Sequence, residues 1–366
     1  MKTMNSADKI NFLLFVLYSL IFLLITTDYL SLNALIYTAN KTDIISYTSI
    51  AKEAPSFPNN NNIIIQHVAQ RFLIPYIIGS TSNFFNLEIF LTYKIFTFIF
   101  IGLLIYSIFF LALKLNFNFN ESILFFSLFF FNPYLIRYHI FNPVQAHDLI
   151  FFLIGFYFSY GIIRQKTNFF YSTGLFSIFI RQTGIAMIVG TLLNFFLQKE
   201  FKFKKIFFYI LIFCILISSI SKIGHYISTH EFSFSYAYGF IYFDYTQIDK
   251  LVRFLLLPAI SFFPILIIFF GKIRSDLNKT CLLVLALTCL LMIGQPFAAG
   301  PDGSSINVVR IASLCYPILL CLIFYSFNFQ RLFSKKIIFY TFLICLQIWS
   351  LHPTFSIFKF FSVLRF

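Results

Sequence analysis

The chain has 366 residues, of which 59% are hydrophobic and only 11% are charged, and its formal net charge is +14. A soluble domain of this length cannot bury so much apolar surface, so the composition excludes a soluble globular protein. Because the Lys and Arg residues mostly flank apolar runs, the positive charge indicates anchoring at the cytoplasmic side of a membrane, and nucleic acid is not an expected partner.

Apolar runs recur from end to end and predict an all-α, polytopic integral membrane protein, one domain over residues 1–366, with about eleven transmembrane helices. The first run follows Lys2 and Lys9 and precedes no cleavage site of small residues, so we expect a retained helix rather than a signal peptide. The six cysteines form no CxxC pair and are expected to be core residues. The expected helices cover residues 11–27, 87–113, 121–136, 147–163, 168–180, 184–198, 206–222, 252–270, 280–294, 307–327 and 337–352.

Basic residues set the expected topology in the cytoplasmic (inner) membrane of a cell. The segment 168–198 is either one long tilted helix or two short ones. Arg164 and Lys166 precede this segment and the cluster Lys199–Lys205 follows it, and both groups favour the cytoplasm. An even number of passes is therefore needed, which predicts a hairpin with its tip at Arg181. The N-terminus is then cytoplasmic and the long first loop, residues 28–86, is extracytoplasmic.

This topology gathers ionisable residues on the outer face of the membrane. Charged groups near the hydrocarbon boundary are costly and are therefore candidate functional residues. Their common side predicts a site that works on the outer leaflet. They are Asp43, Arg71, Asp148, Arg181, Asp302 and Arg310.

The first outer loop carries the clearest motif. Residues 42–53 predict an amphipathic helix in which Asp43 and Tyr47 lie four positions apart, and its apolar face continues to Ala54. Such a helix can lie in the plane of the membrane interface. The segment 70–75, Gln-Arg-Phe-Leu-Ile-Pro, then leads into another apolar stretch.

This pattern resembles the GT-C superfamily of polyprenyl-phosphate-sugar-dependent membrane glycosyltransferases, which includes protein mannosyltransferases and aminoarabinose transferases. Members carry an acidic residue in the first outer loop, a D-x-x-x-Y-x-x-I/A-like helix and an R/K-x-x-x-P segment. Ile44 stands where many members have a second acid, which argues against a two-carboxylate metal site at that point. The resemblance covers mainly residues 10–80. It rests on Asp43, Tyr47, Ile50, Arg71 and Pro75.

The resemblance implies transfer of a sugar from a polyprenyl-phosphate-linked donor to a lipid, glycan or protein acceptor. Asp43 would be the catalytic carboxylate, with Asp28 as its rival, and Asp148 would be a second catalytic acid that orients the acceptor or a metal. Such a reaction needs a base near the acceptor and cations for the leaving phosphate, which the planar fork of arginine suits. The expected substrate-binding residues are Tyr47, Arg71, Arg181, Gln182 and Arg310.

Structural interpretations stay open for several of these residues. Asp43 and Asp148 also fit the role of carboxylates that stabilise the first turn of a helix. Arg181 also fits the role of a cation that reaches the membrane interface from near a helix end. Asp302 fits a turn. A divalent metal ion is an open cofactor hypothesis, because His139 and His147 with Asp148 could bind one, although their spacing is not diagnostic.

Two other functions compete with sugar transfer. O-antigen-type polymerases also carry many helices and outer-loop arginines, but they usually place the largest loop late in the chain. A transporter or flippase of envelope lipids predicts pseudo-repeats and charges at mid-membrane, and neither is visible. If the sugar-transfer hypothesis holds, the carboxylates of Asp43 and Asp148 should lie within about 10 Å of each other.

Overall fold

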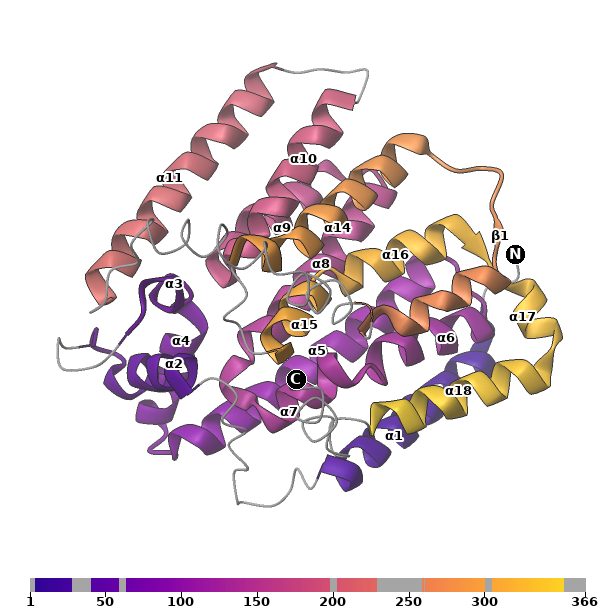
Figure 1. The fold of residues 1–366 in the computed structure, drawn as a ribbon, viewed down its shortest axis with the longest axis horizontal. Helices are drawn as coiled ribbons and strands as arrows, with labels where there is room; N and C mark the ends of the chain where they lie inside the picture. The colour runs from indigo at the N-terminus through magenta and orange to yellow at the C-terminus, as the bar shows by residue number, and fades with distance from the viewer. Residues whose placement is uncertain are drawn as a thin grey trace, which may run out of the picture.

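The computed structural model describes residues 4–27, 41–58, 64–197, 203–228, 259, 261–299 and 305–351. Within these residues the regular structure is helical, apart from the antiparallel pairing of two short strands, β1 (Lys272–Ile273) and β2 (Phe327–Asn328). The predicted all-α class is therefore confirmed. Figure 1 shows α1 (Ser6–Thr27) and α18 (Lys336–Ser350) side by side along one edge of the bundle.

Four described helices are long and apolar enough to cross a membrane, and a bent pair, Phe119–Phe130 with Pro133–Phe141, counts as a fifth if it forms one span. Shorter apolar helices accompany them. The chain is therefore a membrane protein with several spans, while the expected number of about eleven stays a prediction. The four long helices are Ser6–Thr27, Ile89–Lys114, Pro143–Ile163 and Phe203–Ile227.

Most of the expected helices begin and end within a few residues of their predicted positions. The expected helix at 252–270 lies partly outside the described residues, which contain the 3-10 helix η4 (Phe263–Phe270). The matching helices are α1, α5 (Ile89–Lys114), α8 (His147–Ile163), α9 (Thr167–Ile180), α10 (Ile185–Leu197), α11 (Phe203–Ile227), α14 (Lys279–Ala299) and α18.

Two expected helices, 121–136 and 307–327, are broken, so their prediction as single helices was wrong. The first begins as α6 (Phe119–Phe130). After Asn132 it continues as the π-helical turn η1 (Pro133–Arg137) and then α7 (Tyr138–Phe141). The segment Pro133–Phe141 is bent by 41° relative to α6. The second divides into α15 (Ser305–Ser313) and α16 (Tyr316–Ser326). Proline explains both breaks, because its ring clashes with the carbonyl four residues earlier and it has no N–H to donate.

The hairpin with its tip at Arg181 is confirmed. α9 ends at Ile180, the short 3-10 turn η3 (Gln182–Gly184) follows, and α10 returns antiparallel to α9. Phe170 near the start of α9 packs on Phe195 near the end of α10, with ring centroids 5.8 Å apart. A side chain at Gly184 would collide with the backbone after Ser177, so the tight turn requires glycine.

The described parts of the expected first outer loop, residues 41–58 and 64–84, fold as a compact helical group, which Figure 1 shows at one side of the bundle. It contains α2 (Lys41–Glu53), α3 (Gln66–Ala69) and α4 (Leu73–Phe84). The predicted amphipathic helix is thus confirmed as α2. Its apolar face is buried as expected from the four-residue spacing, since Tyr47, Ile50, Ala51 and Ala54 are each at most 2% exposed.

Gly79 fixes the position of α2 on α4. A methyl group at Gly79 would collide with the backbone carbonyl of Ala51, so Gly79→Ala is expected to displace α2 and to destabilise the protein by about 1–3 kcal/mol. Gly102→Ala on α5 is the matched control, because nothing lies within 4 Å of the added methyl. The control should be neutral or stabilising by up to about 1 kcal/mol. Thermal unfolding of both variants in the same detergent tests this, and equal melting temperatures would contradict it.

The topology is tested with single cysteines. Ser56 is exposed after α2 and Ser275 is exposed beside β1, and the expected topology places them on opposite sides of the membrane. In a background where the exposed Cys214 and Cys345 are replaced by serine, Ser56→Cys should react with an impermeant maleimide in intact cells. Ser275→Cys should react only after permeabilisation. The reverse pattern would overturn the outer-face assignment.

Candidate functional site

Asp148 is the centre of a buried polar cluster at the start of α8. Its side chain is 0% exposed, and both oxygens face basic groups. Oδ1 pairs with Nη1 of Arg181 and lies 3.2 Å from Nε2 of His147. Oδ2 lies 3.5 Å from Nε2 of His139 and 3.7 Å from Nε of Arg310. The four basic residues come from α7, α8, the hairpin tip and α15, so distant parts of the chain converge on one carboxylate.

Tyr47 joins the first outer loop to this cluster. Its hydroxyl lies 3.3 Å from Nε2 of His147 and accepts a hydrogen bond from Nη1 of Arg71 at 3.1 Å. Arg71 also donates from Nε to Oε1 of Gln182 at 2.7 Å, and Gln182 donates to Gln70 at 2.9 Å. Side-chain hydrogen bonds therefore join the loop helix, the segment before α4 and the hairpin tip.

The cluster has a closed interior and a more open edge. Arg181 is 1% exposed and Arg310 is 3% exposed, whereas Arg71 and Gln182 are half-buried. Among the described side chains of the cluster, the three arginines outnumber the one carboxylate, so this described part of the site carries an excess of positive charge. Buried cations in such excess favour an anionic ligand, since uncompensated charge is costly away from water.

The hydrogen bond of His139 indicates where its protons lie. Nδ1 of His139 is 2.5 Å from the carbonyl oxygen of Leu135 and must donate to it, so this nitrogen carries a proton. Nε2 of the same ring faces Oδ2 of Asp148 at 3.5 Å.

Arg181 lies at the junction between α9 and η3 and keeps its charge despite complete burial. Loss of hydration lowers the pKa of Arg181 to about 10, and the carboxylate of Asp148 opposes this shift. The guanidinium is therefore still cationic at neutral pH, and it needs a negative partner in the protein or in a ligand.

The described part of the site does not fit a metal ion. Within the described residues, no three His, Cys, Asp or Glu side chains are grouped as a metal site requires. Both oxygens of Asp148 instead face arginine or histidine, and two guanidinium groups beside a carboxylate compete with a cation. The metal-ligand interpretation of His139, His147 and Asp148 is therefore not supported by this arrangement.

Most of the sequence-predicted site residues meet in this cluster. Asp43 is one exception, because its side chain lies outside the described residues, so its expected separation from Asp148 stays a prediction. Its backbone is in α2, one turn or about 6 Å along the helix before Tyr47. Asp28 and Asp302 also lie outside the described residues. The residues that converge are Tyr47, Arg71, Asp148, Arg181, Gln182 and Arg310.

Sequence reasoning missed some members of the site and undervalued others. Gln70, which binds Gln182, was not singled out, although it stands next to Arg71. His139 and His147 were considered only as metal ligands, whereas they contact Asp148. A histidine directly before the acid that opens an apolar helix was the available signal.

Arg137 is a third buried arginine, and the sequence analysis did not single it out. Its side chain is 0% exposed, and it donates to the backbone oxygen of Thr26 at 3.2 Å and to the Thr26 hydroxyl at 2.7 Å. A cation that binds the last carbonyls of a helix also interacts favourably with the helix dipole. Arg137 therefore fixes the end of α1 to the π-helical turn η1.

Comparison of the chain with known proteins found no matching protein family, no similar curated protein and no similar solved structure. The features of the chain that bear on its function are the geometry and charge of the Asp148 cluster and the motif resemblance in the first outer loop.

Proposed function

We propose that this protein is a GT-C-like membrane glycosyltransferase. It transfers a sugar from a polyprenyl-phosphate-linked donor to a lipid, glycan or protein acceptor at the outer face of the cytoplasmic membrane. The observation that carries the proposal is the convergence of Arg71, Arg181 and Arg310 around Asp148 and Tyr47. A site that is rich in arginine and partly open at one edge suits a lipid-linked phosphate.

The arginines act on the leaving phosphate. Cleavage of the sugar–phosphate bond leaves a second negative charge on the phosphate, and preorganised guanidinium groups stabilise that charge as it develops. Arg71 lies at the half-buried edge and binds the phosphate as the donor enters. Its Tyr47 and Gln182 partners hold the guanidinium in position before the ligand arrives, so little reorganisation is needed during the reaction.

Asp148 acts as the organising counter-ion rather than as the base. Arg181 and His147 face one of its oxygens and His139 and Arg310 face the other. Because both oxygens already face these basic groups, the carboxylate is unsuited to approach an acceptor hydroxyl and accept its proton. The base is then Asp43, which the resemblance places on the same loop helix as Tyr47, with Asp28 as the alternative.

The test is sugar transfer by purified protein in proteoliposomes. A panel of polyprenyl-phosphate hexoses and pentoses serves as donors, and release of free polyprenyl phosphate is measured with and without extracts that supply acceptors. Asp43→Asn keeps the size of the side chain but removes the proton acceptor, so it is expected to abolish transfer while the protein stays folded. Asp276→Asn, which changes an exposed carboxylate in the loop after β1, should leave transfer unchanged. Near-normal transfer by Asp43→Asn would move the role to Asp28 or dismiss the assignment.

One observation favours a flippase of anionic lipids as the second candidate. Helices broken near a buried polar site, such as the bent pair of α6 with η1 and α7, are typical of transporters. Movement of a fluorescent polyprenyl phosphate across proteoliposomes, with no cleavage of any sugar donor, would favour this alternative. Donor cleavage without lipid movement would exclude it.

A further inference from the structure

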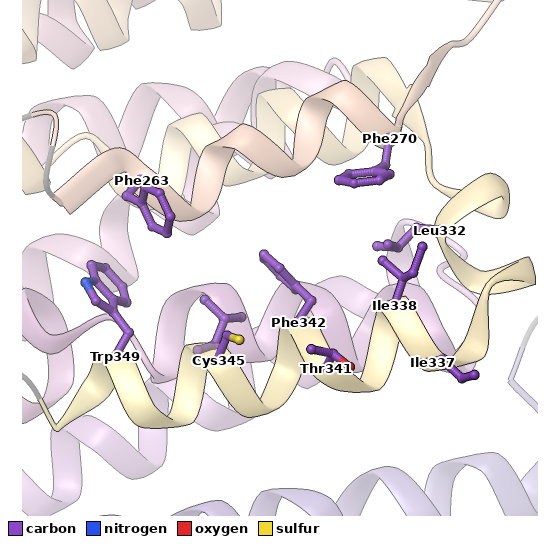
Figure 2. A pocket seen from close by; sticks show the side chains of 10 residues that line it. Phe263, Phe270, Leu332, Ile337, Ile338, Thr341, Phe342, Cys345 and Trp349 are labelled. Atoms are coloured by element: carbon purple, nitrogen blue, oxygen red, sulfur yellow. The ribbon is translucent and has the colours of Figure 1, made fainter.

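An apolar groove lies between η4 and α18, outside the Asp148 cluster. Figure 2 shows Phe263 and Phe270 of η4 facing Trp349 and Phe342 of α18 across this groove. Its volume is about 420 Å³, and Cys345 and Thr341 also contribute to its walls. Thr341 supplies the hydroxyl in an otherwise hydrophobic lining, so the groove is suited to hydrocarbon and not to a polar ligand.

The dimensions of the groove match a lipid chain. Its lining on α18 extends from Ile337 to Trp349, which corresponds to about 18 Å of helix. One leaflet of a bilayer has a hydrocarbon depth of roughly 15 Å. Because the surroundings of a membrane protein are lipid, a groove of this length and polarity is filled by a hydrocarbon chain rather than by water.

The groove is connected to the arginine cluster through a short chain of contacts. Trp349 packs on Tyr134 of η1, with ring centroids 6.4 Å apart. Tyr134 in turn packs with Val309 of α15. The next residue is Arg310, whose Nε lies 3.7 Å from Oδ2 of Asp148. The Trp349 end of the apolar groove therefore adjoins the element that carries one of the cluster arginines.

We propose that this groove holds the hydrocarbon chain of the same lipid whose phosphate group binds at the arginine cluster. The inference rests on the proposed function, because it takes a lipid-linked phosphate as the ligand, and it assigns the chain to the surface between η4 and α18. The contacts of Trp349 with Tyr134 and of Tyr134 with Val309 put one end of the groove beside the helix that carries Arg310, which favours a lipid with its head group at the cluster over the bulk lipids of the bilayer. One amphiphile then provides a negative partner for the described arginines and covers the apolar surface.

Trp349 provides a direct measurement, because it is the only tryptophan in the chain. Protein reconstituted in phosphatidylcholine with brominated acyl chains will have its Trp349 fluorescence quenched by chains in the groove. Farnesyl phosphate carries no bromine and is expected to displace these chains and restore the fluorescence. Citronellyl phosphate, with a shorter chain, should restore less at equal concentration, and inorganic phosphate should restore none.

Two matched variants on α18 test the location. Cys345→Phe fills the groove and is expected to abolish the recovery by farnesyl phosphate, whereas Ile344→Phe should keep it, because Ile344 is 55% exposed and does not line the groove. Equal thermal unfolding of the two variants shows that both are folded. Should Cys345→Phe respond like the wild type, the chain lies elsewhere and the proposal is wrong.

The contribution of the phosphate is tested separately. Farnesol has the same chain without the charge. To restore the same fluorescence, it should need a concentration about tenfold or more above that of farnesyl phosphate. A tenfold difference corresponds to about 1.4 kcal/mol of binding free energy from the head group. Equal recovery by farnesol, or no recovery by any isoprenoid, would overturn the proposal. These fluorescence measurements do not depend on sugar transfer. If only the transferase assay fails, the proposed function is contradicted and the assignment of the groove to a lipid chain stands.

Discussion

Replacing Asp148 by Asn is expected to destabilise the protein by about 3–5 kcal/mol and to abolish its activity. The carboxylate is the common partner of Arg181 and Arg310, and all three side chains are buried. An amide of the same size removes the negative charge that these two guanidinium groups share, in a region that water does not reach. Chemical unfolding in detergent measures the stability, and donor cleavage in proteoliposomes measures the activity.

A second substitution separates stability from function. The double variant Asp148→Asn with Arg181→Gln removes one positive and one negative charge, so it should recover a large part of the lost stability and show a coupling energy above about 1 kcal/mol. It should stay inactive, because a cation for the phosphate is missing. Additive losses in the double variant would mean that Asp148 and Arg181 do not interact, and the charge-pair account of the cluster would be wrong.

Much of the fold could be predicted because the signals are local. The four-residue spacing from Asp43 to Tyr47 and on to Ala51 predicted the buried face of α2, and basic residues on both sides of segment 168–198 predicted its hairpin. The breaks at Pro133 and Pro317 were missed although proline signals them, since hydropathy averaged over a long window does not register a single residue.

The membership of the site was predictable, but its internal pairing was not. Charge and the expected topology predict Arg71, Asp148, Arg181 and Arg310 on one face of the membrane, which selects candidates without a structure. Which of them touch depends on lateral packing between helices, and this is a tertiary property. The sequence therefore predicted Asp148 as a catalytic acid, whereas its contacts with two arginines and two histidines favour the role of a counter-ion.

Arg71→Met is expected to lower kcat/KM for the lipid-linked donor by about 10²–10³, the cost of removing one preorganised donor from a developing oxyanion. The stability should change by less than about 1 kcal/mol, because Arg71 is half-buried and has no carboxylate partner among the described residues. Lys52→Met is the matched control, since it removes an exposed cation from the same loop and should leave both quantities unchanged.

Arg71→Lys distinguishes a phosphate-binding role from a structural one. Lysine keeps the charge but cannot bind Tyr47, Gln182 and a phosphate oxygen at once, because it lacks the planar fork of the guanidinium. We therefore expect Arg71→Lys to recover part of the donor affinity, seen as a lower KM than in Arg71→Met, while kcat stays reduced. If Arg71 only ties the first outer loop to the hairpin tip, both variants should lower the melting temperature and leave the kcat of the folded fraction intact. Measuring melting temperature, kcat and KM on the same preparations decides between these outcomes.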